Sequence, residues 1–219
     1  AEDGIRDSVA SRGLGDVYKR QDNGIRPNSK REKLASLRAA FDKKHGTLTA
    51  ANSSFLTDGA AASLIASESK AKELGLNPKS IIIDYVFTGQ DLEDELLLGP
   101  AYAISKVLDK SGLSLDQMDV IELHEAFAGQ ILSNIKCLES NDFAKEKLGK
   151  DKAVGKIDIN KLNNWGGSLS IGHPFGATGS RLLTTASNRL HIEGGKYALI
   201  AACAAGAHGH AMIIKKYEA

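Results

Sequence analysis

Short apolar runs alternate with amphipathic helical patterns from residue 58 onward, and this alternation constrains the fold of the 219-residue chain more than any other feature. The clearest run, at 80–87, collects Ile, Tyr and Val in a β-branched and aromatic stretch that is typical of a buried strand. Apolar residues at helical spacing occur between the runs. A sequence that switches repeatedly between these two periods predicts an α/β layer structure.

The remaining elements follow the same logic. Residues 60–66 are a small apolar run, and residues 139–162 are charged and aperiodic, which predicts a surface insertion. In chain order, the pattern predicts a helix from the N-cap Ser67 to Gly75, the strand 80–87, a helix over 102–110 that ends at Gly112, a strand over 119–123, a helix after Phe127, a helix after Gly179 that ends at Gly194, a strand over 197–202 and a last strand from about 210 to 217.

The amino-terminal segment differs from the rest. EDGIR at 2–6 is nearly repeated as DNGIR at 22–26, and no sustained apolar period lies between them, so residues 1–21 are interpreted as a foreign or misassembled lead. A mobile native tail is the alternative. Residues 26–44 are basic and predict a solvated amphipathic helix carrying Leu34, Leu37 and Phe41, with contact to a phosphorylated ligand as the alternative.

Charge and cysteine content exclude some classes of protein. The formal charge of +1 gives no basic field that would favour nucleic acid or an acidic membrane surface, so no nucleic-acid partner is expected. Two cysteines, Cys137 and Cys203, do not make a disulfide framework, and we expect free thiols in a reducing compartment. No apolar run reaches the roughly 18 residues that a membrane span needs.

A glycine-lined bend over 163–179, with the sequence NNWGGSLSIGHPFGATG, places His173 just before a helix start. Glycines let the backbone approach a ligand closely, and the helix amino terminus adds free N–H groups that favour developing negative charge. The bend is therefore suited to hold an oxyanion.

Two further candidates lie where predicted strands end. Cys203 follows the strand 197–202, and His124 with Glu125 follows the strand 119–123. Ligands of open α/β sheets collect at the carboxyl ends of the strands, so these residues are positional candidates for a site. The alternative for His124 is a histidine whose hydrogen bonds are simply satisfied at a helix start.

Other kinds of site are weaker on the residues alone. His208, His210 and Cys203 are metal-ligating types, but an H-x-H pattern without a further nearby ligand is a poor metal signature, and no metal is expected. Cys203 with His173 also suits a Cys–His hydrolase, although no orienting third member is evident. Cys137 lacks a glycine elbow or an adjacent base, and we expect it to pack in a helix.

Four separated segments resemble thiolases, the acyl-CoA C-acyltransferases: GTLTAANSSFLTDGAAA at 46–62, HEAFAGQ at 124–130, the run at 163–179 and ALIAACAAGAHGHAM at 198–212. The resemblance covers residues 22–219 and is to the carboxy-terminal half of the family. It implies one βαβαβαββ half of the layered αβαβα thiolase fold over 58–219, with 22–57 as the tail of a loop region. The His-Glu-Ala-Phe form, DNGIRP and the insertion are most similar to the β subunits of mitochondrial trifunctional proteins.

The resemblance also implies roles. The reaction would be that of a 3-ketoacyl-CoA thiolase of fatty acid β-oxidation, with His173 as the base that takes the proton of a nucleophilic cysteine and helps to bind the thioester oxygen. Cys203 would shuttle the proton at the α carbon of acetyl-CoA or at the CoA sulfur. His124 would replace the asparagine that anchors a water beside His173 in many thiolases, forming an oxyanion hole. A backbone N–H near Ala205 would contribute to a second one.

Ligands and partners are implied in the same way. The resemblance points to CoA contacts at Ala50, Ser54 and Leu56, with Ala126 and Phe127 packing on the pantetheine arm. Coenzyme A would be a substrate, and no cofactor or metal is implied. The expected partners are acyl-CoA and CoA, a second copy in a full-length homodimer and a trifunctional protein α subunit. The implied location is mitochondrial, with peripheral association with the inner membrane.

The nucleophile of thiolases belongs to their amino-terminal half, and residues 1–57 contain no cysteine. We therefore expect the chain to be a fragment that shows no thiolytic turnover alone. The alternative is a non-catalytic CoA-binding or assembly fragment, because a lone half would expose apolar surface that its twin normally covers.

Overall fold

The computed structural model describes residues 28–218, so the interpretation of residues 1–21 lies outside the described part. The chain divides into two compact units, the second of which begins at Arg38. In the first unit the structure describes one helix, α2 (Arg31–Ala35), which has no side-chain cap and buries no residue. The amphipathic helix predicted over 26–44 is therefore wrong for 36–44. A short helix without a packed apolar face is not stabilised beyond its first turns.

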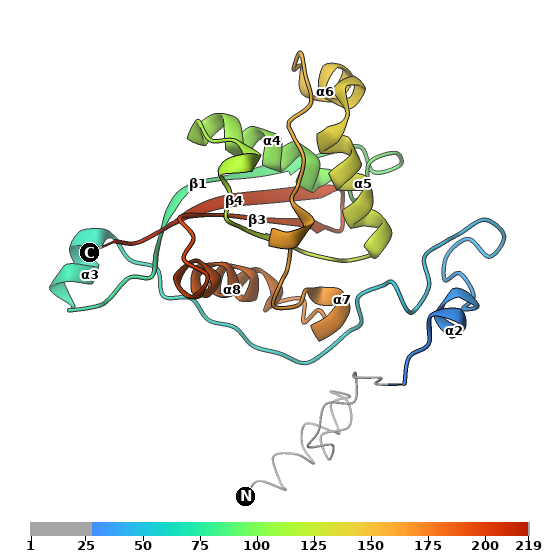
Figure 1. Ribbon diagram of the computed structural model, residues 1–219, viewed down its shortest axis with the longest axis horizontal. Coiled ribbons are helices and arrows are strands. Elements are labelled where there is room, and N and C mark those ends of the chain that lie inside the picture. The colour runs from blue at the N-terminus through green and yellow to red at the C-terminus, as the bar shows by residue number, and fades with distance from the viewer. Residues whose placement is uncertain (1–27, 219) are drawn as a thin grey trace, which may run out of the picture. The chain divides into compact units, whose positions relative to one another are not determined.

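A four-stranded mixed sheet organises the second unit (Figure 1). Its strands are β1 (Ser80–Gly89), β2 (Val120–Leu123), β3 (Tyr197–Ala204) and β4 (His208–Lys216), in the spatial order β1-β4-β3-β2. β2 and β3 are parallel, whereas β4 runs antiparallel to both of its neighbours. The predicted α/β class is confirmed. One difference is that residues 60–66 form no strand in the described sheet, which leaves four strands instead of the five implied by a βαβαβαββ order.

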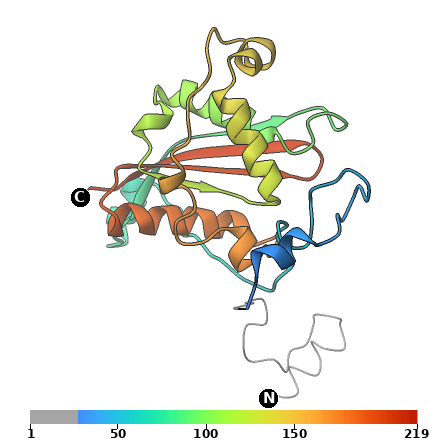
Figure 2. The same cartoon turned by 45° about the vertical axis from the view of Figure 1, so that its right-hand side comes forward.

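Helices cover both faces of this sheet. α4 and α5 lie on one face and α8 lies on the other, as both views show (Figures 1 and 2). The helices of this unit are α3 (Glu68–Glu73), α4 (Gly99–Ser111), α5 (Ala128–Glu139), α6 (Asn141–Leu148), α7 (Ser168–Ile171) and α8 (Thr178–Ile192), with 3-10 turns at Leu115–Gln117 and Ile159–Lys161.

Strand alternation divides the core into two apolar clusters. On β3, Leu199 and Ala201 pack with α4 and α5, whereas Ala198 and Ile200 pack with α8. Successive side chains of a strand point to opposite faces, so a strand buried on both faces must be apolar throughout. This explains why β3 reads as one continuous apolar run rather than as an alternating pattern.

Local signals in the sequence set most helix ends correctly. Ser67 accepts a hydrogen bond from the N–H of Lys70 at the start of α3, and Gly112 ends α4 in the left-handed region with φ +65°. The insertion at 139–162 is more ordered than the sequence predicts. Ser140 caps α6 by accepting a hydrogen bond from the N–H of Phe143, and Ala144 of this helix is fully buried.

Candidate active site

Two imidazole rings lie in contact at the carboxyl end of the sheet. His124 directly follows β2, and its N–H donates to the carbonyl oxygen of Ala201 (2.8 Å), which extends the β2–β3 pairing by one residue. His173 lies in the bend between α7 and α8, and its N–H donates to the carbonyl oxygen of Phe55 (3.0 Å). The ring centroids are 4.1 Å apart and the planes are inclined at 37°. The structure thus brings together two residues that the sequence singled out separately.

Glycine is required where the chain turns toward His173. Gly172 has φ +93°, in the left-handed region that glycine adopts without strain. A Cβ at this position would also collide with the side chain of Thr57. The 55–57 segment therefore contacts the backbone at Gly172 and at His173.

Glu125 joins the turn after β2 to α7. Its carboxylate accepts hydrogen bonds from the side-chain amide of Asn163 (2.6 Å) and from the N–H of Leu169 (3.0 Å), and Gly167 leaves room for it because a Cβ there would overlap the carboxylate. Residues 168–171 form the helical turn α7. A carboxylate that binds a free N–H group at a helix start favours such a turn.

Hydroxyl groups engage the Nδ1 atoms of both histidines. His124 Nδ1 lies 2.9 Å from Ser168 Oγ, which also lies 3.2 Å from Arg181 Nη2. His173 Nδ1 lies 2.6 Å from Thr178 Oγ1, whose hydroxyl donates to the carbonyl oxygen of Pro174 (3.1 Å). Ser168 and Thr178 are not among the site residues predicted from the sequence. The available signal was the position of Ser168 and Thr178 inside the glycine-rich run that contains His173.

A buried charge cluster lies behind this pair, between β2 and α8. Glu122 and Arg189 are fully buried and form an ion pair of 2.8 Å between Oε1 and Nη1. Arg181 Nη1 lies 3.7 Å from the other carboxylate oxygen of Glu122. Glu122 occupies the strand phase that faces α8, so its charge reaches both arginines of that helix. The cluster anchors α8 and leaves the Arg181 cation beside Ser168.

Burial keeps both imidazoles neutral. It lowers the pKa of His124 to about 3, with smaller contributions from His173 and from the Arg181 cation. The pKa of His173 is lowered chiefly by burial and secondarily by Arg181. A neutral imidazole has one N–H donor and one nitrogen acceptor, so each ring is able to donate or to accept a proton at its free nitrogen.

Cys203 lies near the same end of the sheet, where it pairs with Gly209 of β4. Its side chain is 7% exposed, and burial raises the pKa of its thiol to about 11. Alternate residues of a strand face the same side of the sheet. Cys203 is therefore on the side of Leu199 and Ala201, which α4 and α5 cover, whereas His124 is on the side that α8 covers. A shared pocket for Cys203 and His173 therefore stays a prediction.

The residues expected to contact CoA are placed as follows. The N–H of Ser54 donates to the carbonyl oxygen of Ala126 (2.9 Å), so these two lie side by side next to Phe127, which bridges Ser53. Leu56 is exposed, as are Ala50 and Ala205, the latter in the turn between β3 and β4. The structure brings Ser54, Ala126 and Phe127 together, and their roles stay predictions.

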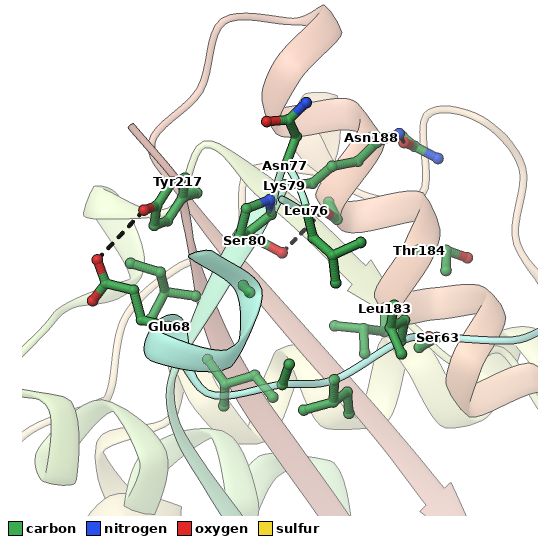
Figure 3. Close-up of a pocket in the computed structure, with 18 of the residues that line it drawn as sticks. Ser63, Glu68, Leu76, Asn77, Lys79, Ser80, Leu183, Thr184, Asn188 and Tyr217 are labelled. Atoms are coloured by element: carbon green, nitrogen blue, oxygen red, sulfur yellow. Dashed lines mark hydrogen bonds between the residues drawn. The ribbon is translucent and has the colours of Figure 1, made fainter. Parts of the chain in front are cut away.

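A separate apolar pocket of about 650 Å³ lies along α8 (Figure 3). It is bounded by the 62–66 segment, α3, the start of β1 and α8, with Ser63, Leu76 and Leu183 among its walls. Ser80 and Ser187 are hydrogen-bonded to each other at its side (2.9 Å). None of the predicted site residues lines it.

Within residues 28–218, no group of three or more His, Cys, Asp or Glu side chains is arranged to hold a metal ion. Over the same range, none of the helices combines the length and the apolar character that crossing a membrane requires.

The chain matches two protein-family models. These are described as "Thiolase, C-terminal domain", over residues 76–216, and "Thiolase, N-terminal domain", over residues 9–69. The chain is 57% identical over 197 residues to the mitochondrial trifunctional enzyme subunit beta of Bos taurus, covering 90% of this chain and 41% of the bovine protein. It therefore spans less than half the length of that relative.

Solved structures give the same picture. Human mitochondrial 3-ketoacyl-CoA thiolase in complex with CoA matches with a TM-score of 0.76 and 32% identity, covering 97% of this chain and 52% of that one. The dimeric peroxisomal thiolase of Saccharomyces cerevisiae matches with a TM-score of 0.74 and 38% identity, covering 90% of this chain and 45% of that one. The arrangement of strands and helices described above is therefore similar to that of thiolases.

Proposed function

Because this chain belongs to the thiolase family, we propose that it supplies the His124–His173 part of the active site of a 3-ketoacyl-CoA thiolase. The observation that carries the proposal is the contact of two neutral imidazoles, the buried His124 and the half-buried His173, at the carboxyl end of the sheet. The two rings come from segments that both resemble thiolases, and the chain is 57% identical to a trifunctional enzyme β subunit.

The reaction assigns chemistry to these groups. A cysteine thiolate attacks the 3-keto carbon of the substrate, the bond between C2 and C3 breaks, and acetyl-CoA leaves as an enolate that takes a proton at C2. The thiol of CoA then attacks the acyl-enzyme thioester and releases the shortened acyl-CoA. A base must draw the proton from each thiol, and donors must stabilise each oxyanion.

Roles for this chain's residues follow from their protonation. We assign His173 as the base for thiol protons and His124 as an oxyanion donor, since both are neutral where they lie. Cys203 is assigned the proton exchanged at C2, and the backbone near Ala205 the second oxyanion. The thiol pKa of about 11 keeps Cys203 protonated at neutral pH, which suits a group that gives a proton to an enolate.

Binding and assembly are proposed from the relatives. A human thiolase structure contains CoA, and a yeast relative is dimeric. We propose that the protein containing this chain binds CoA, with contacts at Ala50, Ser54, Leu56, Ala126 and Phe127. We also propose that it forms a dimer. Similarity to trifunctional enzyme β subunits further supports a place in mitochondrial fatty acid β-oxidation, with an α subunit as partner and peripheral contact with the inner membrane.

A chimera tests the proposed activity. Residues 46–218 of this chain replace the matching segment of the bovine β subunit, which supplies the rest of that protein. The chimera is expected to cleave 3-ketoacyl-CoA in the presence of CoA, and His173→Ala is expected to abolish cleavage without changing the far-UV circular dichroism. His191→Ala is the matched control, since His191 is exposed on α8. A folded chimera that binds CoA but never cleaves the substrate would support the non-catalytic alternative.

The chain on its own is expected to show no thiolytic turnover, because its two cysteines are Cys137 on α5 and the protonated Cys203. Burial raises the pKa of Cys137 as well, with a smaller contribution from Glu95, and this disfavours a nucleophilic thiolate. Cleavage of 3-ketoacyl-CoA by the purified chain, abolished by Cys203→Ala, would contradict this expectation.

A further inference from the structure

Each histidine of the contacting pair His124 and His173 has one ring nitrogen already engaged by a hydroxyl. For His124 the partner of Nδ1 is Ser168 Oγ, and for His173 it is Thr178 Oγ1. A neutral imidazole carries a single proton, so the direction of the Nδ1 hydrogen bond decides whether Nε2 is a donor or an acceptor. The hydroxyl partners set that direction in each case.

The direction at His173 follows from a backbone carbonyl. The hydroxyl of Thr178 donates to the carbonyl oxygen of Pro174 (3.1 Å), which has no proton of its own and accepts only. The single Thr178 proton is then used, so Oγ1 accepts the bond from Nδ1. His173 therefore carries its proton on Nδ1, and its Nε2 keeps a free lone pair.

The direction at His124 follows from a guanidinium. Arg181 Nη2 lies 3.2 Å from Ser168 Oγ, and arginine has donors and no acceptor. Ser168 thus accepts from Arg181 and keeps its own proton for another partner. In the part of the chain that the structure describes, the one other atom within hydrogen-bond distance of Ser168 Oγ is the Nδ1 atom of His124, so this nitrogen is the acceptor for that proton. His124 therefore carries its proton on Nε2.

We propose that Ser168 and Thr178 are positioning residues that hold the two contacting histidines in opposite neutral tautomers, so that His173 presents a proton acceptor and His124 a proton donor. The catalytic meaning of these tautomers rests on the proposed function. There, a base for a thiol proton and a donor to an oxyanion are needed side by side. Two histidines meet both needs because the Thr178 hydroxyl donates to the carbonyl oxygen of Pro174, whereas the Ser168 hydroxyl accepts from Arg181.

Burial, and secondarily the Arg181 cation, keeps both rings neutral. Arg181 of α8 faces Ser168 and disfavours a second cation nearby. Glu122 of β2 and Glu125 of the following turn offset part of that charge from the other side. Protonation of either ring would place a cation 4.1 Å from the neighbouring ring in a buried site.

Imidazole NMR of the full 219-residue chain tests the proposal directly. Uniformly ¹⁵N-labelled chain at neutral pH is examined by long-range proton–nitrogen correlation, in which protonated and unprotonated ring nitrogens have well-separated shifts. The expected result is a protonated Nδ1 in His173 and a protonated Nε2 in His124. His191 is an internal reference for the folded chain, because its Nε2 lies 2.6 Å from the carbonyl oxygen of Lys79 and must carry the proton.

Matched variants separate the two hydroxyls. Thr178→Val removes the acceptor at His173 and is expected to shift its tautomer ratio toward the Nε2–H form by roughly five- to tenfold, the value of one hydrogen bond, with His124 unchanged. Ser168→Ala is expected to reduce the Nε2–H preference of His124 with His173 unchanged. Thr178→Ser retains the hydroxyl and should retain the wild-type tautomer. The same tautomer in both wild-type histidines, or a Thr178→Val variant with an unchanged His173, would overturn the proposal.

The outcome is independent of turnover, since no substrate is present. Opposite tautomers in a chain whose chimera is inactive would reject the proposed function and keep the tautomer assignment. An active chimera whose two histidines share one tautomer would reject the assignment and keep the function.

Discussion

The rings of His124 and His173 lie 4.1 Å apart although they come from different turns of the chain, one after β2 and one before α8. His124 is held by its backbone bond to β3, and His173 by its backbone bond to the 55–57 segment. The contact therefore depends on three separate segments meeting at one end of the sheet.

Burial of neutral His124 makes stability depend on pH. Its pKa falls from 6.5 in the unfolded chain to about 3 in the folded one, so the unfolded state binds more protons between these values and stability rises with pH. The contribution is complete above pH 6.5 and is lost as the pH falls toward 3, by an amount on the order of a few kcal/mol. Urea unfolding of the wild type and of His124→Asn across this range measures it.

The control for the pH dependence is His191→Asn, which removes an exposed histidine and should keep the wild-type slope. His173 contributes with the same sign, since its pKa is also lowered by burial. Identical pH slopes for the wild type and His124→Asn would contradict the prediction.

Cys203 is expected to resist alkylation in the folded chain. Near pH 8, a thiol of pKa about 11 has roughly 100-fold less thiolate than one of pKa 9.0, and burial of the side chain slows the reaction further. Iodoacetamide labelling followed by peptide mass spectrometry, with and without urea, gives both rates. Labelling of Cys203 in the folded chain at the rate of the unfolded chain would show that the thiol is exposed or ionised.

Glu122→Gln is expected to destabilise the chain by about 3 kcal/mol, because it removes the buried counter-charge of Arg181 and one of the two carboxylates paired with Arg189, the other being Glu193. The midpoint of urea unfolding measures the loss. The matched control is Glu68→Gln, which breaks an exposed pair with Lys72 and should leave the midpoint nearly unchanged. Equal effects of the two substitutions would show that the buried cluster does not anchor α8.

Gly172→Ala is expected to cost about 1–3 kcal/mol, because an alanine there has strained backbone and its Cβ collides with Thr57. The His173 ring signals should shift as the bend is displaced. Gly176→Ala is the control in the same loop, since its φ is not in the left-handed region and its Cβ would meet open space. A Gly172→Ala variant as stable as Gly176→Ala would contradict the strain.

The sequence by itself determined the α/β class, most of the strands and helices and the two histidine-bearing turns. These properties follow from local rules: apolar periodicity, N-cap hydroxyls and glycines with positive φ act within a few residues of one another. For the same reason the N-cap Ser67, the helix end at Gly112 and the bend that contains Gly172 could be predicted without any knowledge of the fold.

Tertiary structure alone decided what those turns meet. The hydrogen bond from the N–H of Leu169 to Glu125 supports the helical turn α7 at residues 168–171. The helical period at 34–41 does not produce a long helix, since α2 ends at Ala35 and buries no residue. The hydroxyls beside the two histidines and the buried Glu122–Arg189 pair likewise join segments distant in sequence. Long-range contacts of this kind depend on how strands are ordered and which face each helix covers, and no local pattern of residues encodes them.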